Sequence, residues 1–145
     1  MRRTILMVLV AVLGVGVAGC APRGRAMAGA ATAEEAVRRY LAAADAKDIA
    51  GLSAVWGTDR APLADRASRQ EMERRSIIVF CHLQHDRVEL TGPALGEGGR
   101  QLFRAALRQG ELAVTTTFTA VRNVRSGRWF VETFDLPAVV ALCTH

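Results

Sequence analysis

The chain has 145 residues, 50% of them hydrophobic, and a formal net charge of +5. Eighteen of the nineteen basic residues are arginines, and their only local concentrations are Arg74 with Arg75 and the segment from Arg122 to Arg128. A nucleic-acid-binding domain would gather such charges on one face with aromatic residues between them, so we expect no nucleic-acid partner and interpret both concentrations as solvated surface.

The first twenty residues have the pattern of a bacterial lipoprotein signal. Two arginines precede an apolar run over residues 5–17, which has the length of a signal-peptide core and falls short of the roughly 20 apolar residues that span a bilayer. The run ends in VAGC, residues 17–20, which resembles the lipobox that lipoprotein signal peptidase cleaves. We therefore expect residues 1–19 to be removed and Cys20 to be lipidated, with an ordinary secretory signal as the alternative.

A lipid anchor on Cys20 would hold the protein at the bacterial cell envelope. Acyl chains such as palmitate stabilise membrane attachment by about 0.8 kcal/mol for each buried methylene. Ala21 follows the cysteine, whereas an aspartate there typically marks inner-membrane retention in Gram-negative lipoproteins. The resemblance therefore implies the outer membrane, facing the periplasm. Residues 20–31 are expected to be the lipidated cysteine and a flexible tether, and residues 32–145 the folded domain.

Two further cysteines, Cys81 and Cys143, form an even pair in a chain that is expected to be exported. An oxidising compartment favours a disulfide between them. Closing a loop of this length would stabilise the fold by about 4 kcal/mol. Two free buried thiols or a metal site are the alternatives.

The N-terminal half of the domain is predicted to be helical. A helix over residues 32–46 begins with a threonine and a glutamate at capping-box spacing and continues with apolar residues three and four apart. A shorter helix is expected over 48–55, with an aspartate as its cap. After a loop, capping-box spacing recurs at the start of a third helix over 68–82.

The third predicted helix contains an ambiguous segment, residues 77–80. Met72, Arg75, Ile78 and Val79 fit one face of a helix, but residues 77–80 by themselves would also fit a buried strand. We favour the helix.

The C-terminal half has the two-residue period of strands. Strands are expected over residues 87–91, 100–108, 112–122 and 128–134, with a glycine-proline loop after the first and glycine turns after the second and third. A last short helix, residues 136–142, would carry Cys143 back against the body. The fold class is therefore α+β, with N-terminal helices followed by an antiparallel meander.

This order of elements resembles the nuclear transport factor 2-like superfamily, also called the ketosteroid isomerase-like or SnoaL-like cone fold. The resemblance is carried by AVRRYLAAADAKDIAGLSAVWG, residues 36–57, and RSGRWFVETFD, residues 125–135. It implies a cystatin-like cone in which a curved antiparallel sheet wraps the long helix around an apolar pocket. Dimers are common in the superfamily, so a homodimer is a further implication, although no residue of this sequence indicates one.

Five aromatic residues are candidates for lining such a pocket: Tyr40, Trp56, Phe103, Phe118 and Trp129. Simple core packing is the alternative, because a domain of this size must bury most of its aromatic side chains.

No catalytic residue is assigned. Ketosteroid isomerases set a carboxylate base opposite a tyrosine and a protonated acid, and here the sole tyrosine, Tyr40, has no such arrangement around it in the sequence. Glu132 and Asp135 lie on or beside the last predicted strand and fit a surface ladder charge and a helix cap.

No metal and no cofactor are expected. The densest group of potential ligands runs from Cys81 through His82 and His85, and with Cys143 and His145 it would allow a zinc site of two cysteines and two histidines. That site needs the two cysteines to be adjacent, which is also what a disulfide needs, and export favours the disulfide.

Two functional classes remain. The preferred one is a noncatalytic envelope lipoprotein whose domain binds a small apolar ligand or another envelope protein. The alternative is an isomerase- or dehydratase-like enzyme that uses an acidic residue in the cone pocket. An enzyme should place a buried carboxylate or histidine inside the cone, whereas a binding module should have an apolar or filled interior.

Overall fold

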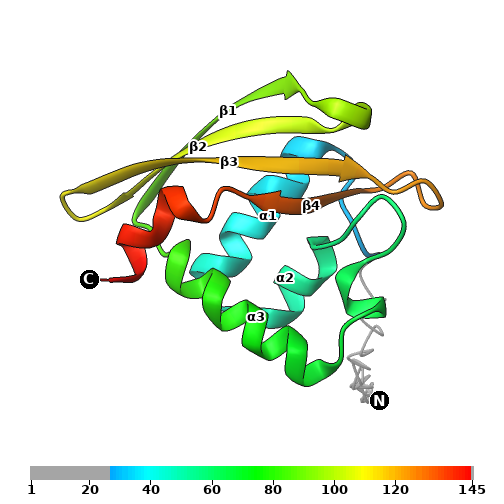
Figure 1. Cartoon of the computed structure of the whole chain (residues 1–145), viewed down its shortest axis with the longest axis horizontal. Coiled ribbons are helices and arrows are strands. Elements are labelled where there is room, and N and C mark those ends of the chain that lie inside the picture. The colour runs from blue at the N-terminus through cyan, green and yellow to red at the C-terminus, as the bar shows by residue number, and fades with distance from the viewer. Residues whose placement is uncertain (1–26, 145) are drawn as a thin grey trace, which may run out of the picture.

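The structure is a computed structural model that describes residues 27–144 (Figure 1). Three α-helices come first, namely α1 (Ala33–Asp45), α2 (Ile49–Val55) and α3 (Arg69–His82). Four strands follow, β1 (Arg87–Leu95), β2 (Gln101–Gln109), β3 (Leu112–Arg122) and β4 (Trp129–Phe134), in one antiparallel sheet of order β1-β2-β3-β4. Short 3-10 helices are η1 (Leu63–Asp65), η2 (Glu97–Gly99) and η3 (Pro137–Cys143). The predicted α+β class is confirmed.

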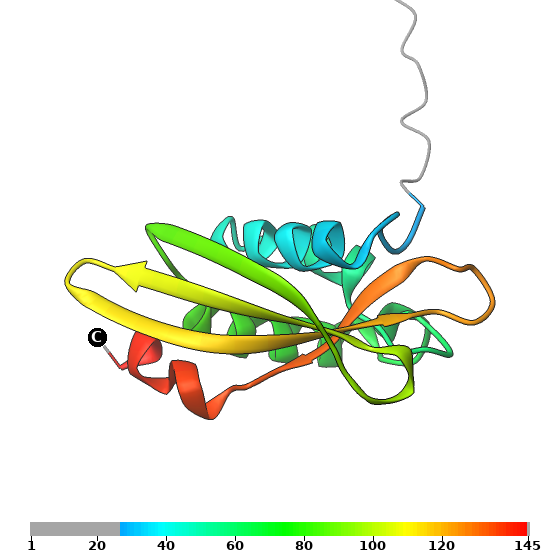
Figure 2. The same cartoon turned by 90° about the horizontal axis from the view of Figure 1, so that it is seen from above.

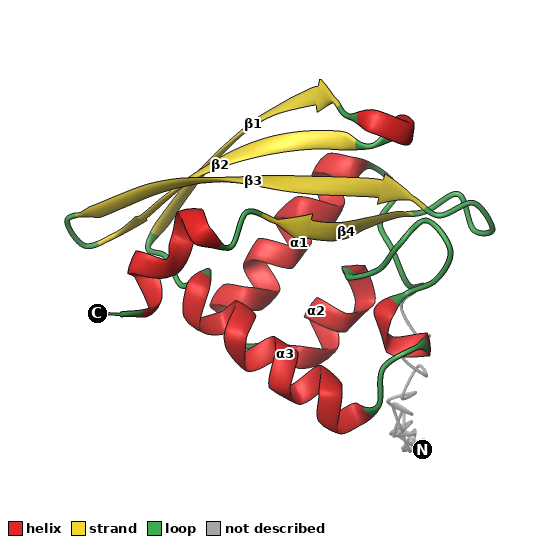
Figure 3. Ribbon diagram, in the orientation of Figure 1, coloured by secondary structure: helices red, strands yellow, loops and turns green. Residues whose placement is uncertain are grey.

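All three α-helices lie on one face of the sheet (Figure 3). The helix α1 packs against β2, β3 and β4, and it also contacts α2 and α3. Seen from above, the strands cross one another at an angle because the sheet twists (Figure 2). The arrangement is the one that the resemblance to the cone fold implied.

The predicted helix starts are those of the structure. The hydroxyl of Thr32 accepts a hydrogen bond from the backbone N–H of Glu35 at 3.1 Å, and Ser68 caps α3 in the same way through the N–H of Glu71 at 3.2 Å. The carboxylate of Asp48 caps α2. These side chains satisfy N–H groups that have no partner inside the helix.

The first strand is longer than predicted. The sequence predicts a loop after Thr91, but β1 continues through the cis peptide Gly92-Pro93 and pairs again with β2 from Ala94. Proline has no N–H to donate, and Gly92 adopts a φ of 139° in which an added Cβ would lie 2.8 Å from the carbonyl oxygen of Leu102. The irregular pair therefore forms a bulge inside the strand.

The buried face of α3 also differs from the prediction. Met72 and Val79 are buried as expected, but Phe80 is buried in place of Ile78. Ile77 is 64% exposed and Ile78 is 50% exposed. The buried Val79 and Phe80 and the exposed isoleucines are consecutive in the sequence and lie on opposite sides of one turn, which leaves an apolar surface on this helix.

The fold begins before the predicted boundary at Thr32. Ala30 is fully buried and exchanges two backbone hydrogen bonds of 2.9 Å with Trp129, and the carbonyl of Gly29 accepts from the guanidinium of Arg128, also at 2.9 Å. The last residues of the expected tether are therefore part of the domain, because they pair with β4. The expected signal and the lipidation at Cys20 lie outside the described residues.

No helix within residues 27–144 is long and apolar enough to cross a membrane.

Candidate functional site

The interior that a cone-fold pocket would occupy is filled by aromatic side chains. The ring of Tyr40 lies 5.7 Å from that of Trp56, 6.0 Å from that of Phe118 and 6.3 Å from that of Phe134, measured between centroids. Tyr40, Phe103 and Phe118 are fully or almost fully buried, whereas Trp56 and Trp129 are half-buried and pack against the core. All five predicted pocket residues pack in or against the core, and Trp56 also lines a cleft between α3 and β4.

The buried polar side chains within residues 27–144 are neutral ones. Ser76, Thr116 and Asn123 are buried, and no aspartate, glutamate or histidine of that range is. Thr116 donates to the carbonyl of Asp135 at 2.9 Å. Burial raises the pKa of the Tyr40 hydroxyl far above its ordinary value, so the group is neutral at physiological pH.

Glu132 is held by Arg100, the residue that precedes β2. Its two carboxylate oxygens accept hydrogen bonds of 2.6 and 2.8 Å from the guanidinium of Arg100, a bidentate pair that raises the pKa of Arg100. The carboxylate is therefore committed to an ion pair and has no role as a base in this arrangement. Asp135, expected to be a helix cap, makes no side-chain capping bond to η3.

Cys81 and Cys143 are joined by a disulfide, with their Cα atoms 4.9 Å apart. The bond links the end of α3 to η3. Both sulfur atoms are thereby lost as metal ligands, and residues 27–144 hold no group of three or more histidine, cysteine, aspartate and glutamate side chains that could bind a metal. His82 and His85 bond through Nδ1 to the backbone carbonyls of Ile78 and Leu83. His145, the remaining ligand of the alternative zinc site, lies outside the described residues.

An apolar cleft of about 260 Å³ lies between α3 and β4. Its walls include Trp56, Ile78, Phe134 and Leu136. The helix α3 forms one wall of this cleft, and the exposed Ile78 is part of that wall. Sequence periodicity missed this surface because it assigned Ile78 to the buried face.

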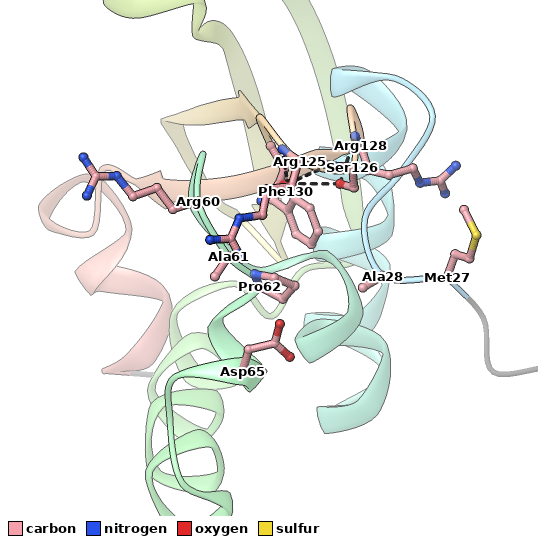
Figure 4. A pocket seen from close by; sticks show the side chains of 11 residues that line it. Met27, Ala28, Arg60, Ala61, Pro62, Asp65, Arg125, Ser126, Arg128 and Phe130 are labelled. Atoms are coloured by element: carbon pink, nitrogen blue, oxygen red, sulfur yellow. Dashed lines mark hydrogen bonds between the residues drawn. The ribbon is translucent and has the colours of Figure 1, made fainter.

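A second groove, of about 380 Å³, lies where the N-terminal segment meets the loop between β3 and β4 (Figure 4). Arg60, Arg125 and Arg128 line it together with Asp65, and Phe130 and Pro62 lie between Asp65 and the loop that bears Arg125 and Arg128. The other lining residues are Met27, Ala28, Ala61, Asn123 and Ser126.

Asn123 gives the β3–β4 loop its shape. Its side-chain oxygen accepts hydrogen bonds from the backbone N–H of Arg125 at 3.0 Å and from that of Ser126 at 2.9 Å, and its amide nitrogen donates to the carbonyl of Thr58 at 3.4 Å. The loop is therefore tied both to itself and to the segment before η1. The sequence marked this stretch only as a turn with several arginines.

No protein-family model matches the chain, and no curated protein matches it. Among solved structures, the chain is similar to the structure of an M. tuberculosis LEH-like epoxide hydrolase, with 22% sequence identity and a TM-score of 0.37, over 77% of this chain and 88% of that chain. A likeness this distant transfers no residue role and no activity, so the chemistry of each site rests on its own residues.

Tyr40 provides a spectroscopic test of the filled interior, because it is the only tyrosine. Since burial raises its folded-state pKa above the unfolded value of about 10, stability is unaffected by this group below pH 10 and declines as the pH rises above it. We expect no tyrosinate absorbance from the native protein near pH 10, and a midpoint near 10 in concentrated guanidinium chloride. A native midpoint near 10 would mean that water reaches the hydroxyl and would contradict the filled interior.

The disulfide should account for a large part of the stability. We expect the double variant Cys81→Ser with Cys143→Ser to lose about 4 kcal/mol of unfolding free energy, measured by urea denaturation. The reduced wild-type protein is the matched control and should unfold at the same urea concentration as the variant. Protein purified from an oxidising compartment and unfolded without reductant should show neither thiol reactive; two reactive thiols there would refute the bond.

Proposed function

We propose that this protein is a lipid-anchored lipoprotein of the bacterial cell envelope, attached to the periplasmic face of the outer membrane in an organism that has one. We further propose that its domain is noncatalytic and binds another envelope protein. The observation that carries the binding role is the exposed apolar surface of α3 beside a filled interior. The anchor is supported by the sequence that ends in Cys20.

The arrangement of the N-terminus is consistent with an anchor. Met27 lies at the surface, and the residues that follow it enter the fold at Gly29 and Ala30. The seven-residue step from Cys20 to Met27 can reach about 25 Å when extended. An acylated Cys20 would therefore keep the domain close to the bilayer without any membrane-binding surface of its own.

The apolar surface of α3 favours a protein partner over a small ligand. Val79 and Phe80 face the core, while Ile77 and Ile78 on the same turn face solvent. A helix segment that is apolar all round is normally covered on every side, and large exposed apolar side chains that adjoin a cleft mark interaction sites. We therefore propose an apolar segment of a second envelope protein as the occupant of the α3–β4 cleft.

The enzyme alternative has a candidate pocket, of about 270 Å³ between α1 and β1, which Asp45 and His85 line. Acid-base catalysis needs a carboxylate or histidine within hydrogen-bond reach of a bound substrate. Within residues 27–144 no aspartate, glutamate or histidine is buried, and in this pocket Asp45 is exposed and His85 is half-buried. Glu132 is engaged by Arg100, the residue before β2.

The anchor is tested by the mass of the mature protein. Intact mass spectrometry of the protein from bacterial membranes should give a chain that begins at Cys20 and carries acyl groups. The variant Cys20→Ala should keep residues 1–19 and incorporate no labelled palmitate. A wild-type mature chain with an unmodified N-terminus would contradict the anchor and indicate an ordinary secretory signal.

The binding surface is tested by site-specific photo-crosslinking in cells. A photoreactive residue in place of Ile78 should yield an adduct to an envelope protein, whereas the same residue in place of the exposed Arg104 on β2 should not. The substitution Ile77→Ser in the crosslinking chain should reduce the adduct several-fold, with an unchanged melting temperature as proof of folding. An adduct of twice the chain mass would show that the partner is a second copy of this chain and would contradict an envelope-protein partner. Equal adducts from both positions would refute the α3 surface as the binding site.

A further inference from the structure

We propose that the arginine groove beside the N-terminal segment binds the phosphate groups of anionic phospholipids in the membrane that carries the anchor. The location of this contact rests on the proposed function, because the anchor brings the groove to the bilayer. The chemistry of the groove does not depend on the anchor and is tested without it.

The groove is the part of the described surface that lies where the chain departs toward Cys20. Met27 is one of its lining residues and stands at its edge, where the described chain begins (Figure 4). With about 25 Å of chain at most between Met27 and an acylated Cys20, headgroups lie within reach of this surface. The sequence between Cys20 and Met27 contains two further arginines, Arg23 and Arg25.

The charge of the groove is unbalanced. Arg60, Arg125 and Arg128 line it against a single carboxylate, that of Asp65, and none of the three arginines takes part in an ion pair within residues 27–144. The arginines of α1 and α3 differ, because each of them pairs with a glutamate on its own helix. The groove thus retains cationic groups for an outside anion.

One of these groups is already partly buried and incompletely bonded. The guanidinium of Arg128 donates from Nη2 to the carbonyl of Gly29 at 2.9 Å, but its Nε–H is buried and has no hydrogen-bond partner. An unpaired buried donor is unfavourable, and guanidinium groups match phosphate oxygens in geometry as well as in charge. Arg128 therefore adds positive charge to the groove, and the exposed Arg60 and Arg125 are the side chains that a phosphate can contact directly.

The loop that carries the arginines is organised before any ligand arrives. Asn123 accepts the backbone N–H groups of Arg125 and Ser126, and the Ser126 hydroxyl accepts the N–H of Arg128 at 3.2 Å. Little conformational freedom of the loop is then left to lose on binding, which favours a contact made by only a few charges.

A weak contact suffices when the domain is already tethered. Each arginine close to an anionic surface contributes about 1 kcal/mol, or about a fivefold change in binding. A short tether raises the effective concentration of headgroups at the groove. The contact would therefore restrict the orientation of the domain on the membrane. Acyl chains at the end of a tether would not restrict this orientation by themselves.

The test measures vesicle binding in the absence of the lipid anchor. The mature-length chain with Cys20→Ser is mixed with vesicles of phosphatidylglycerol and phosphatidylcholine, and with vesicles of phosphatidylcholine alone, and the bound fraction is measured by sedimentation at low salt. We expect binding to the anionic vesicles only. The double variant Arg60→Gln with Arg125→Gln should lower the partition coefficient about 25-fold.

The matched control exchanges the same number of charges elsewhere on the surface. Arg87 and Arg104 are exposed on β1 and β2 and form no ion pair within the described residues, so Arg87→Gln with Arg104→Gln should change the partition coefficient by less than twofold. All four substituted side chains are exposed, and circular dichroism should show an unchanged fold.

Three results would overturn the proposal. These are equal binding to both kinds of vesicle, an equal loss in both double variants, and release of bound protein by millimolar inorganic phosphate at constant ionic strength, which would indicate a site for a small soluble anion. Failure here leaves the acylation of Cys20 untouched, and an unmodified Cys20 would leave vesicle binding by the groove untouched.

Discussion

The close packing of α1 on the sheet is the constraint on which the rest of the structure depends. Ala33, Ala36 and Ala44 are buried on this helix, and their small side chains allow its backbone to approach β3 and β4. Tyr40 on the same helix is also fully buried, and its ring lies near the aromatic rings of Trp56 at the end of α2, Phe118 on β3 and Phe134 on β4. Because dense packing of this kind leaves few voids larger than a water molecule, the centre of the fold is a core, and the surfaces of the domain become the places where it can act.

The two ends of the domain are closed by different chemistry. At one end the disulfide joins α3 to η3, and this closure holds the apolar wall of the α3–β4 cleft against the C-terminal segment. At the other end the contacts are hydrogen bonds: the Asn123 side chain bonds the β3–β4 loop to the carbonyl of Thr58, and the backbone of Ala30 pairs with that of Trp129. The covalent end should depend on redox conditions and the polar end should not. The apolar and the arginine-lined surfaces therefore rest on separate supports.

This separation gives the proposed roles a common physical basis. A lipoprotein needs one surface that tolerates or contacts headgroups and another that meets its partner. The arginine groove adjoins the start of the described chain at Met27, on the side of the proposed anchor, whereas the apolar cleft is bounded by α3 and β4. An apolar surface and a charged one recognise different partners, because burying apolar area favours a protein contact while uncompensated guanidinium groups favour phosphate. A variant that damages one surface should consequently spare the other.

Local patterns in the sequence determined the elements and their starts, since a cap such as Thr32, Asp48 or Ser68 acts within three residues of itself. They also determined the α+β class and the pairing of Cys81 with Cys143 as an expectation. Which side of α3 is buried, where β1 ends and where the domain begins were decided only by the tertiary structure. Ile78 and Phe80 are equally apolar, and Ala30 has no local signal at all; their burial depends on which distant residues pack or pair with them, and those long-range contacts leave no periodicity in the chain.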